Sequence, residues 1–193
     1  MIVGILSDSH GRGDITAAAI RVLREAGAEV FIHCGDIGGG GVLEQLAGLS
    51  AWFVWGNTDD PGPLLTGYVQ SLGLPLPAEK PLKLILAGRV IVVFHGHEPG
   101  FRELADMALA GRVTALSAMT NGADYVLFGH THIPFDERLG AARVINPGAL
   151  HRTSTPSVAT LDLHTDQVHF WRVKDTEVTE PPQLLELPYT ADS

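Results

Sequence analysis

Side chains that can bind metal ions gather in five short segments, and each segment directly follows a short apolar run. The segments carry carboxylates, amide oxygens and imidazoles, whereas the chain has a single cysteine. In chain order they are Asp8-Ser9-His10, Gly35-Asp36, Gly56-Asn57-Thr58-Asp59, His95-Gly96-His97 and Gly129-His130-Thr131-His132. Donors of these types suit hard or borderline divalent cations. The segments therefore predict a metal site that lacks thiolate ligands.

The residue types match a site for two cations. A carboxylate can bridge two cations that lie about 3.5–4 Å apart, which is the separation used in two-metal phosphoryl chemistry. The predicted reaction is attack on phosphorus by a hydroxide held between the cations, which also neutralise the non-bridging oxygens. No covalent enzyme intermediate is needed, so Ser7 and Ser9 have no predicted nucleophilic role.

Each segment also has a plain structural explanation when it is taken alone. Asp8 and His10 fit a turn followed by a surface histidine, and Gly35-Asp36 is an ordinary turn sequence. His95 and His97 would fit polar caps at the end of a strand. All five segments together, each at the end of a predicted strand, favour one shared site.

The elements that must position these segments alternate between short strands and helical patterns. Apolar residues recur at helical spacing from Ile15 to Ala26, with Asp14 as the expected N-cap and Gly27 as the stop signal. The predicted order is strand Ile2–Leu6, that helix, strand Val30–Ile32, helix Val42–Leu49 and strand Trp52–Trp55. This alternation predicts a partly parallel sheet, and ligand sites gather beyond the carboxyl ends of parallel strands.

The rest of the chain is predicted to hold one more helix and mostly antiparallel strands. The segment Pro61–Pro81 is rich in proline and glycine, which favours an irregular connection. A hairpin is expected around Ala87-Gly88-Arg89, between strands Leu82–Leu86 and Val90–Phe94. Beyond it we expect a helix over Phe101–Thr120 and strands at Tyr125–Phe128, Phe135–Leu139, Arg143–Ile145, Ser157–Leu163 and Val168–Val173.

The composition indicates one globular domain over residues 1–175, followed by an extended or poorly packed tail over residues 176–193. The formal net charge of −9 argues against binding of long nucleic acid, because no broad basic face is available. Cys34 alone cannot form an intrachain disulfide, and we find neither a basic leader nor a membrane-spanning run. We therefore expect a cytoplasmic protein that acts on a small phosphoester.

The order of the five motifs resembles that of a known family. The pattern D-x-H, G-D, G-N-x-D, H-G-H and G-H-x-H resembles the calcineurin-like metallophosphoesterases, and most closely their small YfcE-type phosphodiesterase branch. Asn146-Pro147-Gly148-Ala149 resembles the N-P-G-S stretch of that branch. The resemblance covers about residues 1–173. It implies an α/β (α+β) fold, namely a four-layer αββα sandwich of two mixed β-sheets flanked by helices.

The resemblance also implies a role for each candidate ligand. Asp8, His10 and His132 would hold the first metal, Asp36 would bridge, and Asn57, His95 and His130 would complete the second site. Asp36, Asn57 and His97 are the expected catalytic residues. Mn²⁺ is our first choice for both ions, while Fe, Ni, Co, Zn and Mg are compatible with these ligands.

One position departs from the wider superfamily. Many members have histidine directly after the asparagine, where it can assist the leaving group, whereas this chain has Thr58. A threonine hydroxyl is not a useful general acid at neutral pH. The proton must then come from His97 or from a metal-bound water, or else the substrate has a good leaving group. We therefore expect activated or aryl-like phosphodiesters to react faster than alkyl monoesters.

Two other functions fit the same fold. A metal-binding scaffold or protein-interaction module is the first, but such a protein would be expected to lose ligands, and here every position is filled. A nuclease is the second, and the acidic charge argues against it, although a small nucleotide phosphodiester stays open.

A homodimer could form through exposed apolar positions in Pro61–Pro81.

A structural role is the preferred interpretation for the other conspicuous residues. Cys34 is expected to be a buried strand-end residue, His33 to be structural, and His164 and His169 to be solvated. The run Gly38–Gly41 is interpreted as a flexible rim, because no Lys-Ser or Lys-Thr ending follows it. Arg12 and Arg152 are candidates both for phosphate contact and for a plain surface role.

Overall fold

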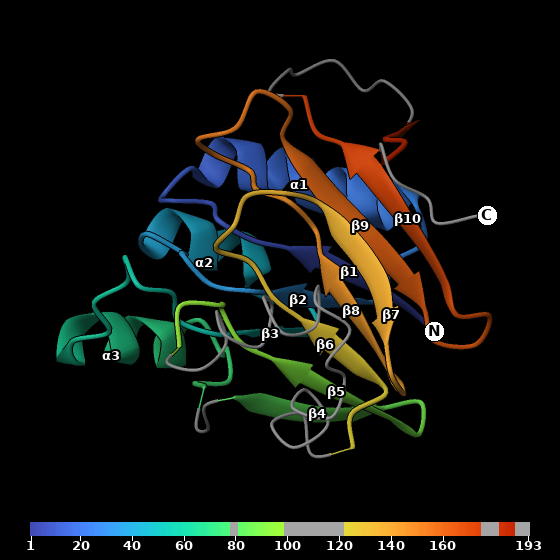
Figure 1. The fold of residues 1–193 in the computed structure, drawn as a ribbon. Coiled ribbons are helices and arrows are strands. Elements are labelled where there is room, and N and C mark those ends of the chain that lie inside the picture. The colour runs from blue at the N-terminus through green and yellow to red at the C-terminus, as the bar shows by residue number, and fades with distance from the viewer. Residues whose placement is uncertain (78–80, 99–121, 175–181, 188–193) are drawn as a thin grey trace.

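Two mixed β-sheets form the centre of the protein. A computed structural model describes residues 1–77, 81–98, 122–174 and 182–187. The first sheet has the strand order β11-β10-β9-β1-β2-β3 and the second the order β4-β5-β6-β8-β7 (Figure 1). Figure 1 shows α1 and α2 beside the first sheet, on the side away from the second. The predicted α/β fold with two mixed sheets is confirmed.

The first sheet is parallel at one side and antiparallel at the other. Strands β1 (Ile2–Leu6), β2 (Val30–His33) and β3 (Ala51–Phe53) run parallel. They are connected through helices α1 (Gly13–Glu25) and α2 (Gly40–Leu46). The antiparallel side consists of β9 (Ser157–Asp162), β10 (Gln167–Arg172) and β11 (Gln183–Leu184).

The second sheet has three parallel central strands, β5 (Arg89–Val93), β6 (Tyr125–Leu127) and β8 (Ala142–Asn146). Strands β4 (Leu82–Leu86) and β7 (Phe135–Leu139) form its antiparallel edges. The predicted hairpin between β4 and β5 is confirmed. Ala87 and Gly88 turn there with φ values of 48° and 76°, which is typical of tight two-residue hairpin loops.

Alternating apolar residues face the two sides of each sheet. On β1, Val3 and Ile5 pack between the sheets, where they meet residues of the second sheet such as Ile91. Leu6 belongs instead to the cluster that α1 and α2 cover. On β5, Ile91 and Val93 likewise pack between the sheets, whereas Val92 belongs to a third cluster on the outer face of the second sheet. The predicted helix over 101–120 lies outside the described residues.

Four details differ from the sequence-based expectations. Within Pro61–Pro81, residues Pro63–Ser71 form helix α3, because proline is favoured in the first helical turn. Helix α1 starts before Asp14, whose carboxylate pairs with Arg12 at 2.7 Å and does not cap the helix. The run predicted as a flexible rim partly belongs to α2, which begins at Gly40.

The fourth difference concerns the C-terminal segment. Within the predicted tail, β11 pairs with β10, and Leu185 and Leu187 pack against the cluster between the sheets. These residues are therefore part of the packed structure, because their leucines cover apolar surface. The predicted boundary between residues 175 and 176 stays a prediction. Among the described residues, none of the helices is long and apolar enough to cross a bilayer.

Candidate metal centre

The five motif segments meet at one edge of the two sheets. Backbone hydrogen bonds continue past the ends of β1 and β2, where the N–H of Asp8 donates to the carbonyl of Gly35 at 3.0 Å. The N–H of His10 likewise donates to the carbonyl of Asp36 at 2.9 Å. In the second sheet, the N–H of Gly129 donates to the carbonyl of His95 at 2.9 Å. The strand-end prediction for these segments is therefore confirmed.

One group of donor atoms surrounds the buried carboxylate of Asp8. Nε2 of His132 lies 3.2 Å from Oδ1 of Asp8, and the rings of His10 and His132 are 5.5 Å apart. One donor atom from each of these three residues falls within 4.8 Å of the others. Nε2 of His10 also lies 3.6 Å from Oδ2 of Asp36, which links this group to the next.

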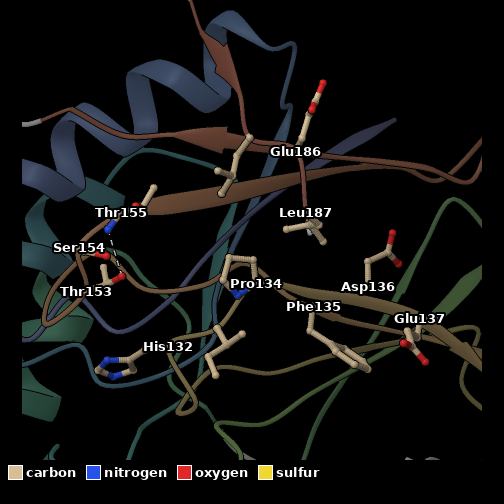
Figure 2. A pocket seen from close by; sticks show the side chains of 12 residues that line it. His132, Pro134, Phe135, Asp136, Glu137, Thr153, Ser154, Thr155, Glu186 and Leu187 are labelled. Carbon is tan, nitrogen blue, oxygen red and sulfur yellow. Dashed lines mark hydrogen bonds between the residues drawn. The ribbon is translucent and has the colours of Figure 1, made fainter. Parts of the chain in front are cut away.

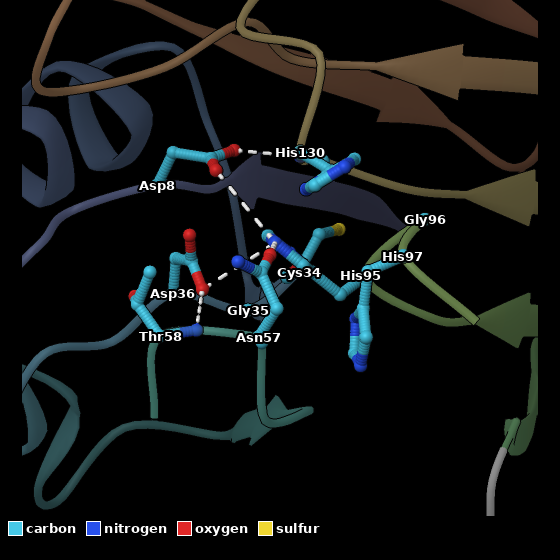
Figure 3. Close-up of polar contacts among 12 residues, drawn as sticks. Asp8, Cys34, Gly35, Asp36, Asn57, Thr58, His95, Gly96, His97 and His130 are labelled. Atoms are coloured by element: carbon cyan, nitrogen blue, oxygen red, sulfur yellow. Dashed lines mark hydrogen bonds and ion pairs between the residues drawn. The ribbon is translucent and has the colours of Figure 1, made fainter. Parts of the chain in front are cut away.

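A second group of donor atoms lies around His95. Its Nε2 is 3.4 Å from Oδ1 of Asp36, 4.0 Å from Oδ1 of Asp8 and 3.1 Å from Oδ1 of Asn57. The ring of His130 lies 5.1 Å from that of His95. Figure 3 shows Asp8, Asp36, Asn57 and His95 directed toward one another. All seven predicted ligands are thus close together, and Asp36 lies between His10 and His95.

The hydrogen bonds of His95 fix the direction of its free nitrogen. Its Nδ1 lies 2.8 Å from the carbonyl of Cys34, which can only accept, so Nδ1 carries the proton. Nε2 therefore faces three oxygens: it donates to Asp36 when the ring is protonated, and it offers a lone pair to a cation when the ring is neutral. Burial opposes a proton on this ring, but the bond to Asp36 and the carbonyl of Cys34 raise the pKa of His95 above its ordinary value. A positive charge is favoured at this point.

Two buried polar atoms of candidate ligands lack a hydrogen-bond partner within the described part of the chain. Among the described residues, Oδ1 of Asp8 and Nε2 of His10 are buried and accept no hydrogen bond. Burial also raises the pKa of Asp8, because its negative charge is removed from water. Divalent cations would satisfy both atoms and offset the buried negative charge, so the donor set fits metal ions.

The pKa values of the two central carboxylates are shifted in opposite directions. Burial opposes ionisation of Asp36, but hydrogen bonds from His95 and from the N–H of Thr58 outweigh it. The pKa of Asp36 therefore lies well below its ordinary value, and the residue is a carboxylate at neutral pH. Oδ1 accepts from Thr58 at 3.0 Å, which orients Oδ2 toward His10.

The backbone at this centre is strained. Asp8, His10, Asp36, His130 and His132 all have φ between 44° and 66°, a left-handed conformation that side chains other than glycine seldom adopt. Such conformations cost about 1–3 kcal/mol each and cluster at functional sites. Packing must hold five candidate ligands in this conformation, which is typical of a site selected for geometry over stability.

Glycines precede several candidate ligands because other side chains approach them closely. A Cβ atom on Gly56 would overlap the carboxylate of Asp36, and one on Gly129 would overlap the hydroxyl of Ser7. At these two positions a neighbouring protein group therefore occupies the room that the missing side chain leaves.

Three residues that the sequence reasoning left without a role position the ligand loops. Asp59 accepts from the N–H groups of Ile37, Gly38 and Gly56 at 2.7–3.0 Å, and thereby joins the loops after β2 and β3. The sequence does mark Asp59, because it is the last residue of the G-N-x-D motif.

The other two act on the second sheet. Glu98 accepts from the N–H groups of His95 and Gly96 at 3.2 and 2.8 Å. The fully buried Asn146 donates to the carbonyl of Gly129 at 2.8 Å and to Oγ1 of Thr131 at 3.0 Å. The N-P-G-A stretch therefore braces the G-H-x-H loop.

The residues assigned to structural roles have the expected exposure. His33 and Cys34 are fully buried, and His33 binds the hydroxyl of Ser9 at 2.8 Å. His164 and His169 are exposed. His97 is exposed as well, with its ring 6.4 Å from that of His130 and Nδ1 3.8 Å from Glu98. It lies at the rim of the centre.

Comparison with known proteins assigns the family. The model of the calcineurin-like phosphoesterase superfamily domain matches residues 1–166. The chain belongs to this superfamily. The resemblance inferred from the motif order is therefore confirmed, and a family of metallophosphoesterases implies divalent metal ions at the cluster of aspartates and histidines.

Members of the superfamily resemble the chain over most of its length. A probable metallophosphoesterase of Bacillus subtilis, YsnB, is 30% identical over 187 residues, which cover 93% of this chain and 96% of that one. A phosphodiesterase of Methanocaldococcus jannaschii is 26% identical over 84% of this chain and 93% of its own.

Solved structures of other proteins share the fold. A structure of an archaeal phosphodiesterase matches with a TM-score of 0.68 at 23% identity, covering 90% of this chain and all of that one. Vps29 of Entamoeba histolytica in complex with Zn²⁺ matches with a TM-score of 0.61 at 17% identity, covering 96% and 98%. At these identities the likeness concerns the fold alone.

Proposed function

We propose that the protein is a phosphodiesterase that depends on two divalent metal ions and hydrolyses a small phosphodiester. The proposal rests mainly on one observation, which is the convergence of donor atoms from Asp8, Asp36 and His95, beside which Oδ1 of Asp8 and Nε2 of His10 are buried without a hydrogen bond to any described residue. The relatives named as phosphodiesterase and metallophosphoesterase support the same class of reaction.

The seven candidate ligands divide between two adjacent metal positions. Asp8, His10 and His132 would hold one ion, Asn57, His95 and His130 the other, and Asp36 would contact both. Asp8 also belongs to both groups of donor atoms, so its free Oδ1 could face either ion. We retain Asp36 as the bridge, because its two oxygens lie 3.4–3.6 Å from a histidine of each group. Mn²⁺ remains the first choice of metal.

Two bound cations would supply a hydroxide near neutral pH and neutralise the charge on the phosphate oxygens. Hydrolysis then forms one P–O bond to the oxygen of water and breaks the P–O bond to the departing alcohol. Asn57 and His130 are exposed at the centre, whereas Asp8, Asp36 and His95 are buried beneath them. This arrangement leaves the centre open to a substrate from one side.

The departing alcohol requires a proton, and Thr58 does not deliver it. The backbone N–H of Thr58 holds Asp36, and its side chain is a neutral hydroxyl. His97 at the rim is an imidazole outside the ligand set, with its ring 5.4 Å from that of His95. We assign it the role of proton donor for poor leaving groups. Aryl esters, which leave without a proton, should depend less on it.

The replacement of Asp36 by asparagine tests the function. Asp36→Asn removes the bridging charge but keeps the volume, so hydrolysis of bis(4-nitrophenyl) phosphate with Mn²⁺ should fall by at least about 10³-fold, as for loss of a metal's electrostatic stabilisation. The far-ultraviolet circular dichroism spectrum should not change. Asp162→Asn is the matched control and should keep wild-type turnover, because Asp162 lies on β9 beside Ile2, at the end of β1 away from the centre.

The competing function is a metal-binding scaffold or protein-interaction module on this fold. Vps29 structures among the neighbours show that the fold is not restricted to proteins named as phosphodiesterases. The complete set of seven donors favours the enzyme. Metal-loaded protein that hydrolyses neither phosphodiesters nor phosphomonoesters would favour the scaffold and contradict our proposal.

A further inference from the structure

A cavity of about 530 Å³ lies beside the candidate metal centre. Three segments that are distant in the sequence form it, namely residues 132–137, residues 153–155 and the C-terminal residues 185–187. The backbone N–H of Leu185 donates to the carbonyl of Phe170 at 2.8 Å, which fixes the C-terminal wall to β10. The volume falls within the range of about 300–1,000 Å³ that is usual for small-molecule sites.

The cavity adjoins the centre at His132, which belongs to both. Nε2 of this residue lies 3.2 Å from Asp8, and the same side chain lines the cavity. Figure 2 shows His132 next to Thr153 and Ser154 at one end, and Asp136 and Glu137 at the other. A phosphate bound at the centre would therefore direct one of its substituents along the cavity.

The cavity walls favour an uncharged apolar group. Its apolar lining consists of Ile133, Pro134, Phe135, Leu185 and Leu187. Hydroxyl groups are present at Thr153 to Thr155, but none of the described lining residues is a lysine or an arginine. A second phosphate or a carboxylate would therefore find no cation there.

The charged residues at the end of the cavity away from His132 also disfavour an anionic substituent. Asp136 forms two hydrogen bonds of 2.7 Å with the guanidinium of Arg143, so this pair is close to neutral. Glu137 and Glu186 are exposed, and their negative charges are not compensated by a cation in the described lining. An anionic substituent would be repelled by both residues.

We propose that this cavity binds an ester substituent of the substrate, and that it selects phosphodiesters with an uncharged, apolar, aryl-sized group. The assignment rests on the proposed metal centre, since the phosphate must be held beside His132. It restricts the substrate class further, because diesters that carry an additional anionic group, such as nucleotides with a second phosphate, are disfavoured.

Direct binding of non-hydrolysable phosphonates tests this assignment separately from activity. Protein loaded with Mn²⁺ is titrated with methylphosphonate, phenylphosphonate and 4-carboxyphenylphosphonate in a calorimeter. We expect the phenyl compound to bind at least about tenfold more tightly than the methyl compound, as burial of an aromatic ring predicts. The carboxyphenyl compound should lose most of this gain.

Two variants and a control locate the effect. Ile133→Ser removes an apolar side chain that is 67% exposed, so the fold should tolerate it, and the phenyl-to-methyl ratio should fall at least about threefold. Glu186→Gln should strengthen binding of the carboxyphenyl compound alone. Ile85→Ser on β4 is the matched control, because Ile85 is 70% exposed and does not line the cavity. It should keep the wild-type ratio.

The possible failures are distinguishable. Equal affinity for the phenyl and methyl compounds, or an unchanged ratio in Ile133→Ser, would overturn the cavity assignment while the metal centre remained supported by phosphonate binding. If neither phosphonate binds and no phosphodiester is hydrolysed, the proposed function fails and the cavity assignment fails with it.

Discussion

At the scale of single residues, Asp8 and His95 each have one polar atom bound by the protein and another directed to the shared centre. Oδ2 of Asp8 accepts from the N–H of His130 at 3.1 Å, which leaves Oδ1 free. Nδ1 of His95 is bound by Cys34 in the same way. Partners of this kind orient metal ligands before any ion arrives. Backbone groups, which a pattern of side chains does not specify, therefore fix the orientation of these two donors.

His33 gives the clearest pH dependence at this scale. The N–H of Gly35 donates to its Nδ1 at 3.2 Å, so Nε2 carries the proton and donates to the hydroxyl of Ser9. Burial lowers the pKa of His33 to about 3, from an ordinary value of 6.5. Between pH 6.5 and pH 3, His33 binds a proton in the unfolded chain but stays neutral in the folded protein. The contribution of His33 to stability is therefore complete above pH 6.5 and is lost as the pH falls toward 3.

The replacement of His33 by glutamine should reduce this dependence. The contribution of His33 to the loss of stability is up to about 1.4 kcal/mol per pH unit within the window from 6.5 to 3. His33→Gln keeps a donor for Ser9 but does not titrate, so its free energy of unfolding should fall less steeply between pH 7 and pH 4. Urea denaturation at several pH values measures the slope. An unchanged slope would contradict the assignment.

At the scale of elements, the loops after β2 and β3 act as one unit because Asp59 joins them. Its carboxylate accepts three backbone N–H groups, two from the loop that carries Asp36 and one from the loop that carries Asn57. Asparagine has only one acceptor oxygen, so Asp59→Asn must leave part of this set unsatisfied. The distance between the candidate ligands Asp36 and Asn57 should then vary.

We expect Asp59→Asn to weaken Mn²⁺ binding by about 10–100-fold, the usual cost of losing a partner that orients metal ligands. The midpoint of thermal unfolding should fall by only a few degrees. Metal titration beside a thermal scan separates the two effects. Asp60→Asn, the exposed neighbour, is the control. A variant that binds Mn²⁺ as tightly as the wild type would show that the loops are fixed by other contacts.

Strands and ligand loops could be predicted from the sequence because their signals are local. Short β-branched runs that end at Asp36 or His95 identify the strand ends, and parallel topology brings those ends together. Helix α3 was missed, because the proline and glycine content of its surroundings suggested a loop while Pro63 in fact starts the helix. Propensity is a weak guide where proline can occupy the first turn.

The positioning residues and the cavity could not be predicted in the same way. Asn146 binds the loop of Gly129 across the sheet, and no periodic pattern reports such a pair. The cavity depends on Leu187, which packs beside residues 132–137 although about fifty positions separate them. Contacts of this kind follow from the tertiary arrangement, so only coordinates reveal them.

At the scale of the whole molecule, the chain is acidic and its candidate metal centre contains two buried aspartates. The formal net charge is −9, so cations should be attracted to the protein while long nucleic acid should be repelled. The described surface includes Leu64 on α3, which is 93% exposed. A homodimer through this segment stays a prediction, as do the cytoplasmic location and the identity of the metal.

The number of bound ions tests the central claim most directly. Chelator-treated protein is titrated with Mn²⁺ by calorimetry, and the bound metal is measured after equilibrium dialysis. We predict two ions per chain for the wild type and no more than one at comparable affinity for Asp36→Asn, because the shared carboxylate is lost. Binding of fewer than two ions by the folded wild-type protein, or of two ions by Asp36→Asn with unchanged affinity, would contradict the dinuclear centre.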